Sequence, residues 1–186
     1  MNRLIREIFD LGRILVLTMV VVIIVFTFVV RTSAVEGTSM LPTLEHEDEL
    51  LVVSFFYTPR HDDIIVAHAP NLYDHKRQRQ GKDVIKRVIG LEGDVILIDK
   101  ETGLVYRNGA ALDAIEEGVL TDSNRQSDLE VTVPAGFVFV LGDNRHRHGS
   151  ADSRCDSIGL IDVNYIVGRA FFRLSPFSDK KFGFVS

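Results

Sequence analysis

The hydrophobic pattern of this chain changes at Arg31. From Ile14 to Val30 the sequence is apolar without a single charge, and after Arg31 it breaks into short apolar runs separated by Gly, Pro, Asn and Asp. As a helix, the first segment would span roughly 25 Å at about 1.5 Å per residue, which approaches the hydrocarbon thickness of a bilayer. The second pattern is typical of a domain built from short strands.

The short apolar runs predict strands, and no stretch after Arg31 keeps a long helical period. A strand–KETG–strand pattern between Val95 and Tyr106 predicts a hairpin, and Asn108-Gly109 marks a further turn. Polar stretches at Asn71–Lys82 and Asp113–Asp128 are predicted surface loops. The predicted strands are Glu49–Ser54, Asp63–Ala67, Val84–Gly90, Asp94–Asp99, Leu104–Arg107, Leu129–Val133, Phe137–Leu141 and Ile166–Leu174.

The charges beside the apolar segment predict its orientation. Arginines at positions 3, 6 and 13 precede it, whereas only Arg31 follows closely. Because cytoplasmic flanks carry the excess of positive charge, we expect a cytoplasmic N-terminus over residues 1–13, a transmembrane anchor over residues 14–31 and an extracytoplasmic domain over residues 32–186. The alternative is a cleavable signal peptide with Thr32–Ala34 as its small-residue site, but the apolar stretch exceeds the usual length. A buried core helix rarely lacks polar residues over five turns.

Composition limits the chemistry. The net charge of −5 and the absence of Trp give no reason to expect nucleic-acid binding. The single cysteine, Cys155, excludes an internal disulfide framework and a cysteine-based zinc site. His146 and His148 would share one side only in an extended segment, so a metal pair there is disfavoured. We expect no metal and no cofactor.

A serine lies shortly after the apolar segment, in the stretch "VEGTSMLPTL" from Val35 to Leu44. Ser39 is a poor nucleophile unless a base takes its proton. Six histidines are present, so a Ser-His-carboxylate triad stays open. A second candidate base is Lys86 in "DVIKRVIG", where Lys86 and Arg87 stand between apolar pairs.

Adjacent residues of a strand face opposite ways, so either Lys86 or Arg87 lies against an apolar face. Desolvation would lower a lysine pKa from about 10.4 by about two units or more, and a neutral amine is a competent general base. The alternative is an edge strand from which both cations reach water. A polar loop from Leu141 to Arg154, "LGDNRHRHGSADSR", forms a third cluster in which Asp152 and Arg154 are placed to pair.

Together these segments resemble the type I signal peptidases, membrane-anchored Ser-Lys endopeptidases. The resemblance covers nearly the whole chain, with the motifs in the family's order and spacing. Its lysine motif, Lys86–Asp94, departs only at Glu92, where the family usually has proline. The other matching positions are Gly37, Ser39, Met40, Pro42, Thr43, Leu44, Asp63–Ile65, Gly142–Arg145 and Ser150–Arg154.

The resemblance implies a role for each matched polar residue. Ser39 would be the nucleophile, Lys86 the general base, and Ser150 the residue that hydrogen-bonds and orients the Lys86 amine. The Asp152–Arg154 ion pair would support the site.

Two features of the motifs affect these roles. Gly37 stands where some members carry a hydroxyl for the oxyanion hole, so backbone N–H groups would do more of that work. The interval between Asn144 and Ser150 is about two residues longer than the common family pattern, which leaves Ser153 as a substitute for Ser150.

The implied reaction is cleavage of signal peptides from exported preproteins after small residues at −3 and −1. Preproteins and the lipid bilayer would be the partners, close to the secretion translocon. The expected pocket residues are Val35, Met40, Leu44, Val84 and Ile85, although plain core is the alternative for them, above all for Leu44.

Two rival functions stay open. One is a self-cleaving Ser-Lys regulator that cuts its own Ala-Gly bond, for which Ala135-Gly136 is present. The other is an anchored, non-catalytic β-domain that binds exported peptides.

Overall fold

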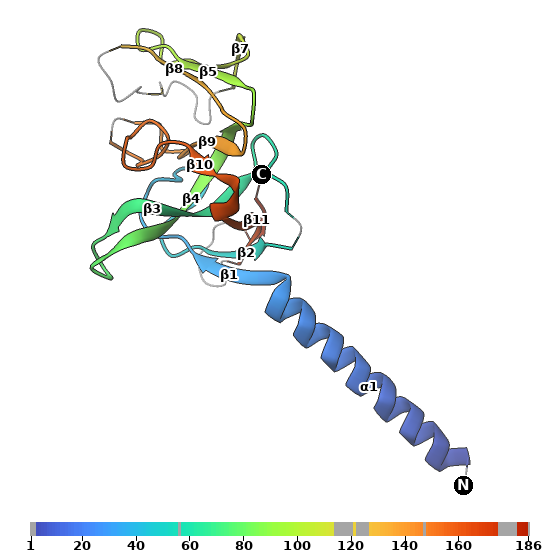
Figure 1. Cartoon of the computed structure of the whole chain (residues 1–186). Helices are drawn as coiled ribbons and strands as arrows, with labels where there is room; N and C mark the ends of the chain where they lie inside the picture. The colour runs from blue at the N-terminus through green and yellow to red at the C-terminus, as the bar shows by residue number, and fades with distance from the viewer. Residues whose placement is uncertain are drawn as a thin grey trace.

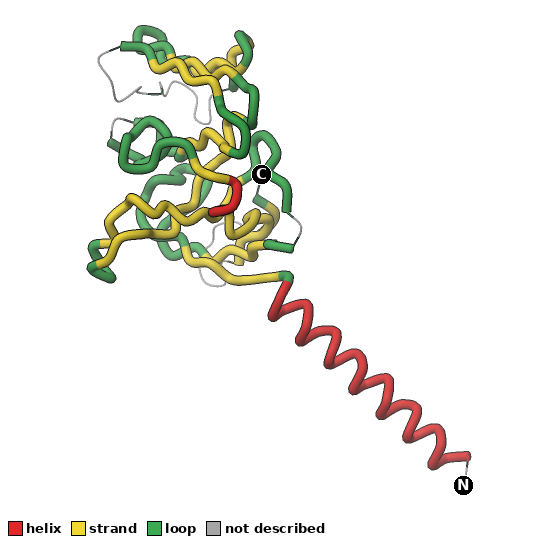
Figure 2. Tube along the Cα trace, viewed as in Figure 1, coloured by secondary structure: helices red, strands yellow, loops and turns green. Residues whose placement is uncertain are grey.

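The computed structural model describes residues 3–55, 57–113, 121, 127–146, 148–174 and 182–185. Helix α1 (Arg3–Phe28) projects as a single rod from a β-domain that contains all the described strands (Figures 1 and 2). Large apolar side chains are exposed along α1 from Ile8 to Ile24. Among the described residues, no helix combines the length and the apolarity that a membrane span needs.

The predicted end of the apolar helix at residue 31 is wrong. Helix α1 stops at Phe28, and Val30 and Arg31 already belong to strand β1 (Val30–Ala34). They pair with Val53 and Val52 of the neighbouring strand, so the β-ladder takes over their backbone hydrogen bonds. The helix therefore leads into the domain almost without a linker.

The described strands form two antiparallel sheets, which confirms a mainly β, antiparallel domain. The larger sheet has the order β1-β2-β11-β3-β4-β9-β10, with β12 added on β11, and the smaller one has the order β7-β6-β5-β8. The only helix described after α1 is the short 3₁₀ turn η1 (Val163–Tyr165). The remaining strands are β2 (Glu49–Val53), β3 (Ile64–Asp74), β4 (Arg79–Gly90), β5 (Val95–Ile98), β6 (Val105–Arg107), β7 (Ala110–Ala111), β8 (Leu129–Thr132), β9 (Phe137–Leu141), β10 (Ile161–Asp162), β11 (Ile166–Leu174) and β12 (Gly183–Phe184).

The predicted turns and loops have mixed outcomes. The hairpin between Val95 and Tyr106 is confirmed by the pairing of β5 with β6. Asn108 and Gly109 both have positive φ, as a tight hairpin turn requires, and they join β6 to β7. The predicted loop Asn71–Lys82 is wrong, because β3 and β4 continue through it as a paired hairpin. The second predicted loop, Asp113–Asp128, lies mostly outside the described residues.

Strand β4 is the centre of the domain. It lies between β3 and β9, so the edge-strand interpretation of Lys86 and Arg87 is wrong. Its apolar residues enter each of the three core clusters: Ile85 joins the first, Val84 and Val88 the second, and Ile89 the third. A polar side chain on this strand is therefore held by the most extensively packed part of the fold.

Candidate active site

The serine loop follows β1 and is fixed by the core. The backbone of Val35 pairs with Asp48 and Glu47, and the side chains of Met40 and Leu44 are almost fully buried. Arg173 of β11 adds a hydrogen bond to the Thr43 carbonyl oxygen. Ser39 thus stands in a loop whose two ends are tied to the larger sheet.

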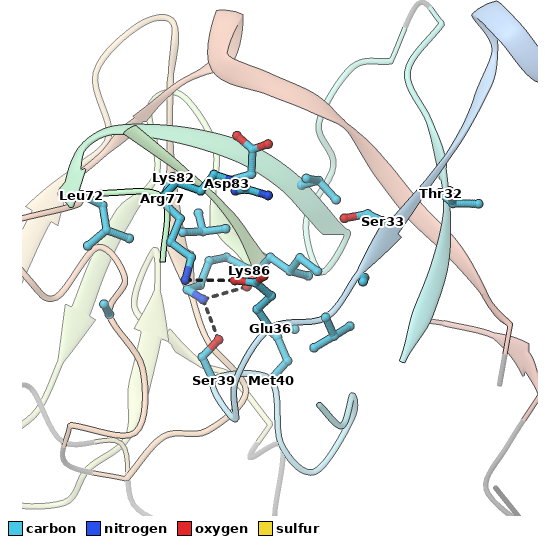
Figure 3. Close-up of a pocket in the computed structure, with 16 residues that line it drawn as sticks. Thr32, Ser33, Glu36, Ser39, Met40, Leu72, Arg77, Lys82, Asp83 and Lys86 are labelled. Carbon is cyan, nitrogen blue, oxygen red and sulfur yellow. Dashed lines mark hydrogen bonds and ion pairs between the residues drawn. The ribbon is translucent and has the colours of Figure 1, made fainter. Parts of the chain in front are cut away.

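Lys86 reaches Ser39 from strand β4. Its Nζ lies 2.8 Å from Ser39 Oγ and also donates to the Ile85 carbonyl oxygen at 2.8 Å (Figure 3). The Lys86 side chain is buried, with 3% of the residue exposed. Burial lowers the pKa of the Lys86 amine to about 8, against an opposing influence from the Asp152 and Asp143 carboxylates. The neutral amine is therefore far more populated near physiological pH than that of an exposed lysine.

The histidines lie elsewhere in the described part of the chain. His61 pairs with Asp94 at 2.6 Å and His68 with Asp83 at 2.8 Å. His46 lies beside the backbone of Gly37. No described histidine hydrogen-bonds Ser39, so the structure gives the serine a lysine as its basic neighbour. No cluster of three or more metal-ligating side chains occurs among the described residues.

The polar loop after β9 packs directly on the serine loop. The backbone N–H of Asn144 donates to the Ser39 carbonyl oxygen at 3.1 Å, and the Asn144 side chain donates to the Thr38 carbonyl oxygen at 3.1 Å. A Cβ at Gly142 would collide with the Ser39 carbonyl oxygen and the Ser150 side chain. The glycine of this motif is thus required by the close approach of two loops.

The predicted Asp152–Arg154 ion pair is present and fully buried. Arg154 Nε and Nη2 donate to the two Asp152 carboxylate oxygens at 2.8 and 2.7 Å. Burial alone would raise the pKa of Asp152, but the bonds from Arg154 hold it below its usual value. Asp152 also accepts the N–H of Gly142 at 2.9 Å, so the ion pair fixes the start of the polar loop.

A second buried ion pair was not found from the sequence. Arg87 Nε and Nη2 donate to the two Asp143 carboxylate oxygens at 2.8 and 2.7 Å. In the sequence Asp143 stands only as a position of the matched Gly142–Arg145 motif, and its partner lies 56 positions earlier in the chain. An arginine that follows a buried lysine in a central strand was the available signal, because it too needs a buried counter-charge.

Ser150 lies at the site without the expected contact. Its hydroxyl is buried beside Gly142 and close enough to Asp152 to help lower the pKa of that carboxyl, but among the described residues no hydrogen bond joins it to the Lys86 amine. Ser153, the substitute, accepts the Val140 N–H at 2.9 Å and donates its own N–H to the Val140 carbonyl oxygen. Ser153 is thus part of the attachment to β9, whereas Ser150 holds the position near the serine loop.

A cavity of about 400 Å³ opens beside Ser39 and Lys86. Val35, Met40, Val84 and Ile85 line it as expected. Leu44 does not line it, because that side chain is fully buried in the first core cluster. The sequence missed lining residues contributed by β1, the β3–β4 hairpin and the polar loop: Thr32, Ser33, Ala34, Glu36, Val66, Leu72, Arg77, Lys82, Asp83 and Ala151.

A serine hydroxyl beside a buried lysine with a lowered pKa is the arrangement found in Ser-Lys hydrolases, a variant of the serine triad. The family model described as "Signal peptidase, peptidase S26" matches residues 8–175. The chain therefore belongs to the signal peptidase family, peptidase S26.

Individual relatives agree with this assignment. The chain is similar to a probable signal peptidase I-1 of Synechocystis sp., with 37% identity over 89% of this chain and 81% of the relative. It is also similar to a signal peptidase I of Bacillus caldolyticus, with 37% identity over 84% of this chain and 86% of that protein. The predicted family and enzyme class, a serine endopeptidase that removes signal peptides from preproteins, are confirmed.

A crystal structure of a signal peptidase I from Enterococcus faecalis V583 is also similar, with a TM-score of 0.44 and 29% sequence identity. The likeness covers 61% of this chain and 97% of that one.

Replacing Asp152 with Asn should lower the free energy of unfolding of the full chain by about 3–5 kcal/mol, because it removes the carboxylate that accepts two hydrogen bonds from the buried Arg154 guanidinium. Chemical denaturation of the two proteins measures this difference. Glu130→Gln, on an exposed position of β8, is the control and should change stability by less than about 0.5 kcal/mol. Equal stability of the two variants would show that the pair is not structural.

Proposed function

We propose that Ser39 is the nucleophile and Lys86 the general base with which this signal peptidase cleaves its substrates by acyl transfer. The observation that carries the proposal is the 2.8 Å contact between Lys86 Nζ and Ser39 Oγ, made by a buried amine whose pKa is about 8. The general base must be within hydrogen-bond reach of the proton it takes, and it must be unprotonated before it acts. The contact supports the first condition, and the lowered pKa supports the second because it makes the neutral amine accessible near physiological pH.

Each proton transfer has an assigned group. Lys86 Nζ takes the Ser39 hydroxyl proton as Oγ bonds to the carbonyl carbon of the −1 residue. The resulting ammonium gives this proton to the leaving amine as the peptide C–N bond breaks, which leaves an acyl ester on Ser39. Lys86 then takes a proton from water, the hydroxide attacks the ester, and the proton returns to Ser39 Oγ as the carboxylate product leaves.

The oxyanion that forms on the −1 carbonyl oxygen needs hydrogen-bond donors. Among the described residues, the backbone N–H of Ser39 has no hydrogen-bond partner, so it is available for this purpose. Gly37 has no hydroxyl to add, and its φ of 88° suits glycine. The Gly37 N–H is directed to His46 Nδ1 at 3.2 Å. The stabilisation of the oxyanion thus falls mainly on the backbone.

The cavity suits an extended peptide. Strand β1 is at the edge of the larger sheet, and Thr32, Ser33 and Ala34 line the cavity. A substrate can therefore add to this region as a further strand. The apolar walls formed by Val35, Met40, Val84 and Ile85 are proposed to accept the small side chains at −3 and −1.

We further propose that α1 anchors the enzyme in the membrane, with residues 1–13 in the cytoplasm and the β-domain outside. Support comes from the exposed apolar side chains of α1 and from the arginines that precede them. A signal peptide cut after Ala34 would remove β1 from its pairing with β2, which favours an uncleaved anchor. The active site would then lie close to the bilayer and near the translocon from which preproteins emerge.

The rival functions have less support. A self-cleaving regulator would have to cut Ala135-Gly136, which lies after both Ser39 and Lys86 in the chain. A non-catalytic peptide-binding domain has no need of a buried lysine beside a serine.

Ser39→Ala and Lys86→Met should each reduce cleavage of a preprotein with an Ala-x-Ala site by about 10³-fold or more, because each removes one half of a cooperating pair. The test is a cleavage assay on the detergent-solubilised full chain. Ser157→Ala and Lys100→Met, at exposed positions, are the matched controls and should retain full activity. Wild-type protein that binds the preprotein but leaves it intact would favour the binding-domain function.

The value of kcat/KM should rise with pH and level off above about 8, because only the neutral Lys86 amine can take the serine proton. Folded Lys86 has a lowered pKa, so lowering the pH through about 8 protonates it and stops catalysis. Initial rates with a peptide that has no ionisable group in this range measure the profile. A profile that falls as the pH rises through this range would exclude Lys86 as the base.

The full chain should remain in the membrane fraction after an alkaline wash and should retain its N-terminal residues, as an uncleaved anchor requires. Val20→Arg combined with Ile23→Arg should release it, because each charge costs about 2.5–3.5 kcal/mol near the centre of a membrane helix. Val20→Leu combined with Ile23→Leu is the control. Release of the wild-type chain, or loss of residues 1–34, would contradict the anchor.

A further inference from the structure

The substrate cavity has a charged end that the proposed chemistry does not use. Near Ser39 its walls are mainly apolar, but farther along β4 they include Lys82, together with Arg77 from the β3–β4 hairpin and Glu36 from the loop after β1 (Figure 3). These side chains lie where the substrate must pass if it extends along β1 and β4.

Glu36 connects the two walls of the cavity. Its Oε1 lies 3.3 Å from Lys76 Nζ and its Oε2 lies 3.3 Å from Lys82 Nζ. Hydrogen bonds from these two ammonium groups lower the pKa of Glu36 below its usual value, so it is ionised at neutral pH. The ion pairs therefore join the loop after β1 to the β3–β4 hairpin across the substrate path.

The three cations at this end, Lys76, Arg77 and Lys82, are matched in number by carboxylates, but the two lysines share one of them. Arg77 is paired with Asp74 at 3.1 Å, and Asp83 accepts a contact from His68 at 2.8 Å. The single carboxylate of Glu36 is shared by Lys76 and Lys82. Of these two lysines only Lys82 lines the cavity, and the other cation at this end of the lining, Arg77, already has Asp74 as its own partner.

The position of Lys82 fixes which substrate residue it can reach. Four residues along β4 separate it from Lys86, a distance of about 13 Å at about 3.3 Å per residue. An extended peptide has the same rise. With the −1 residue at Ser39, the side chain about four residues upstream, at about position −5, would lie beside Lys82.

We propose that Lys82 is a specificity-determining residue that binds an acidic side chain of the signal peptide at about position −5. The assignment rests on the proposed cleavage site at Ser39. In the free enzyme Glu36 holds the Lys82 ammonium in place. When substrate binds, the substrate carboxylate shares or replaces that contact, and Lys76 continues to neutralise Glu36.

The test compares two otherwise identical peptides that carry Asp or Asn at −5. For the wild-type full chain, kcat/KM should be about two- to five-fold higher with Asp at low salt, the range of a partly exposed ion pair. The preference should decline as the salt concentration rises. Peptides with the Asp moved to −4 or −6 locate the position of the contact.

Variants of Lys82, Glu36 and Lys76 distinguish direct binding of the substrate carboxylate by Lys82 from a general effect of charge. Lys82→Gln should bring the Asp-to-Asn ratio close to one, and Lys82→Arg should keep a preference for Asp. Glu36→Gln should increase the preference, because a competing carboxylate is removed. Lys76→Gln should leave most of the preference for Asp, since Lys76 does not line the cavity. Lys100→Gln, outside the cavity, is the control and should leave the ratio unchanged.

Two results would overturn the assignment. One is a ratio of kcat/KM with Asp to kcat/KM with Asn that is one or less in the wild type. The other is a Lys82→Gln variant whose ratio equals that of the wild type or that of the Lys76→Gln variant. If the wild-type enzyme cleaves neither peptide, the proposed catalytic site at Ser39 is wrong, and the assignment of Lys82 is then wrong as well. Cleavage of the Asn peptide by the variants shows that Ser39 and Lys86 still function.

Discussion

The active site depends on keeping the Lys86 amine out of water. An exposed lysine is protonated at neutral pH and cannot take a proton from serine. Lys86 escapes this because it lies on the central strand of the larger sheet, among residues that belong to all three core clusters. The fold thus lowers the pKa of Lys86 by burial, as its proposed role as the base requires. The serine loop, tied to the core through Met40 and Leu44, brings the hydroxyl to within 2.8 Å of it.

Burial alone would not keep the pKa of Lys86 low if unpaired carboxylates lay nearby. Asp152 and Asp143 both favour the charged form of Lys86, and a free carboxylate there would restore the proton. Each is bound instead by the side chain of an arginine, Asp152 by Arg154 and Asp143 by Arg87. The two buried ion pairs therefore do more than shape the polar loop, because they offset negative charge that would raise the pKa of Lys86, the proposed base.

Local patterns in the sequence predicted the main strands, whereas they offered Lys86 only as one candidate base for Ser39, and the family resemblance singled out that pair. The predicted boundaries of β9 and β11 agree with the structure, and the alternation around Lys86 indicated a buried cation. The β3–β4 hairpin had no such signal, since its outer half is polar on both strands and reads as a loop. The Arg87–Asp143 pair and the charged end of the cavity depend on contacts between distant segments. No pattern within one segment could have shown them.

The charged end of the cavity is also linked to the base. Lys82 is among the groups that lower the pKa of Lys86, although its influence is smaller than that of burial. The effect of the Lys82 charge on the pKa of Lys86 depends on how much of that charge is neutralised by nearby carboxylates and screened by salt. Glu36 neutralises part of its charge in the free enzyme, and a bound acidic side chain would neutralise more. An acidic substrate bound to Lys82 would therefore slightly raise the pKa of Lys86. The gain in binding would be offset in part by a smaller fraction of neutral Lys86 amine.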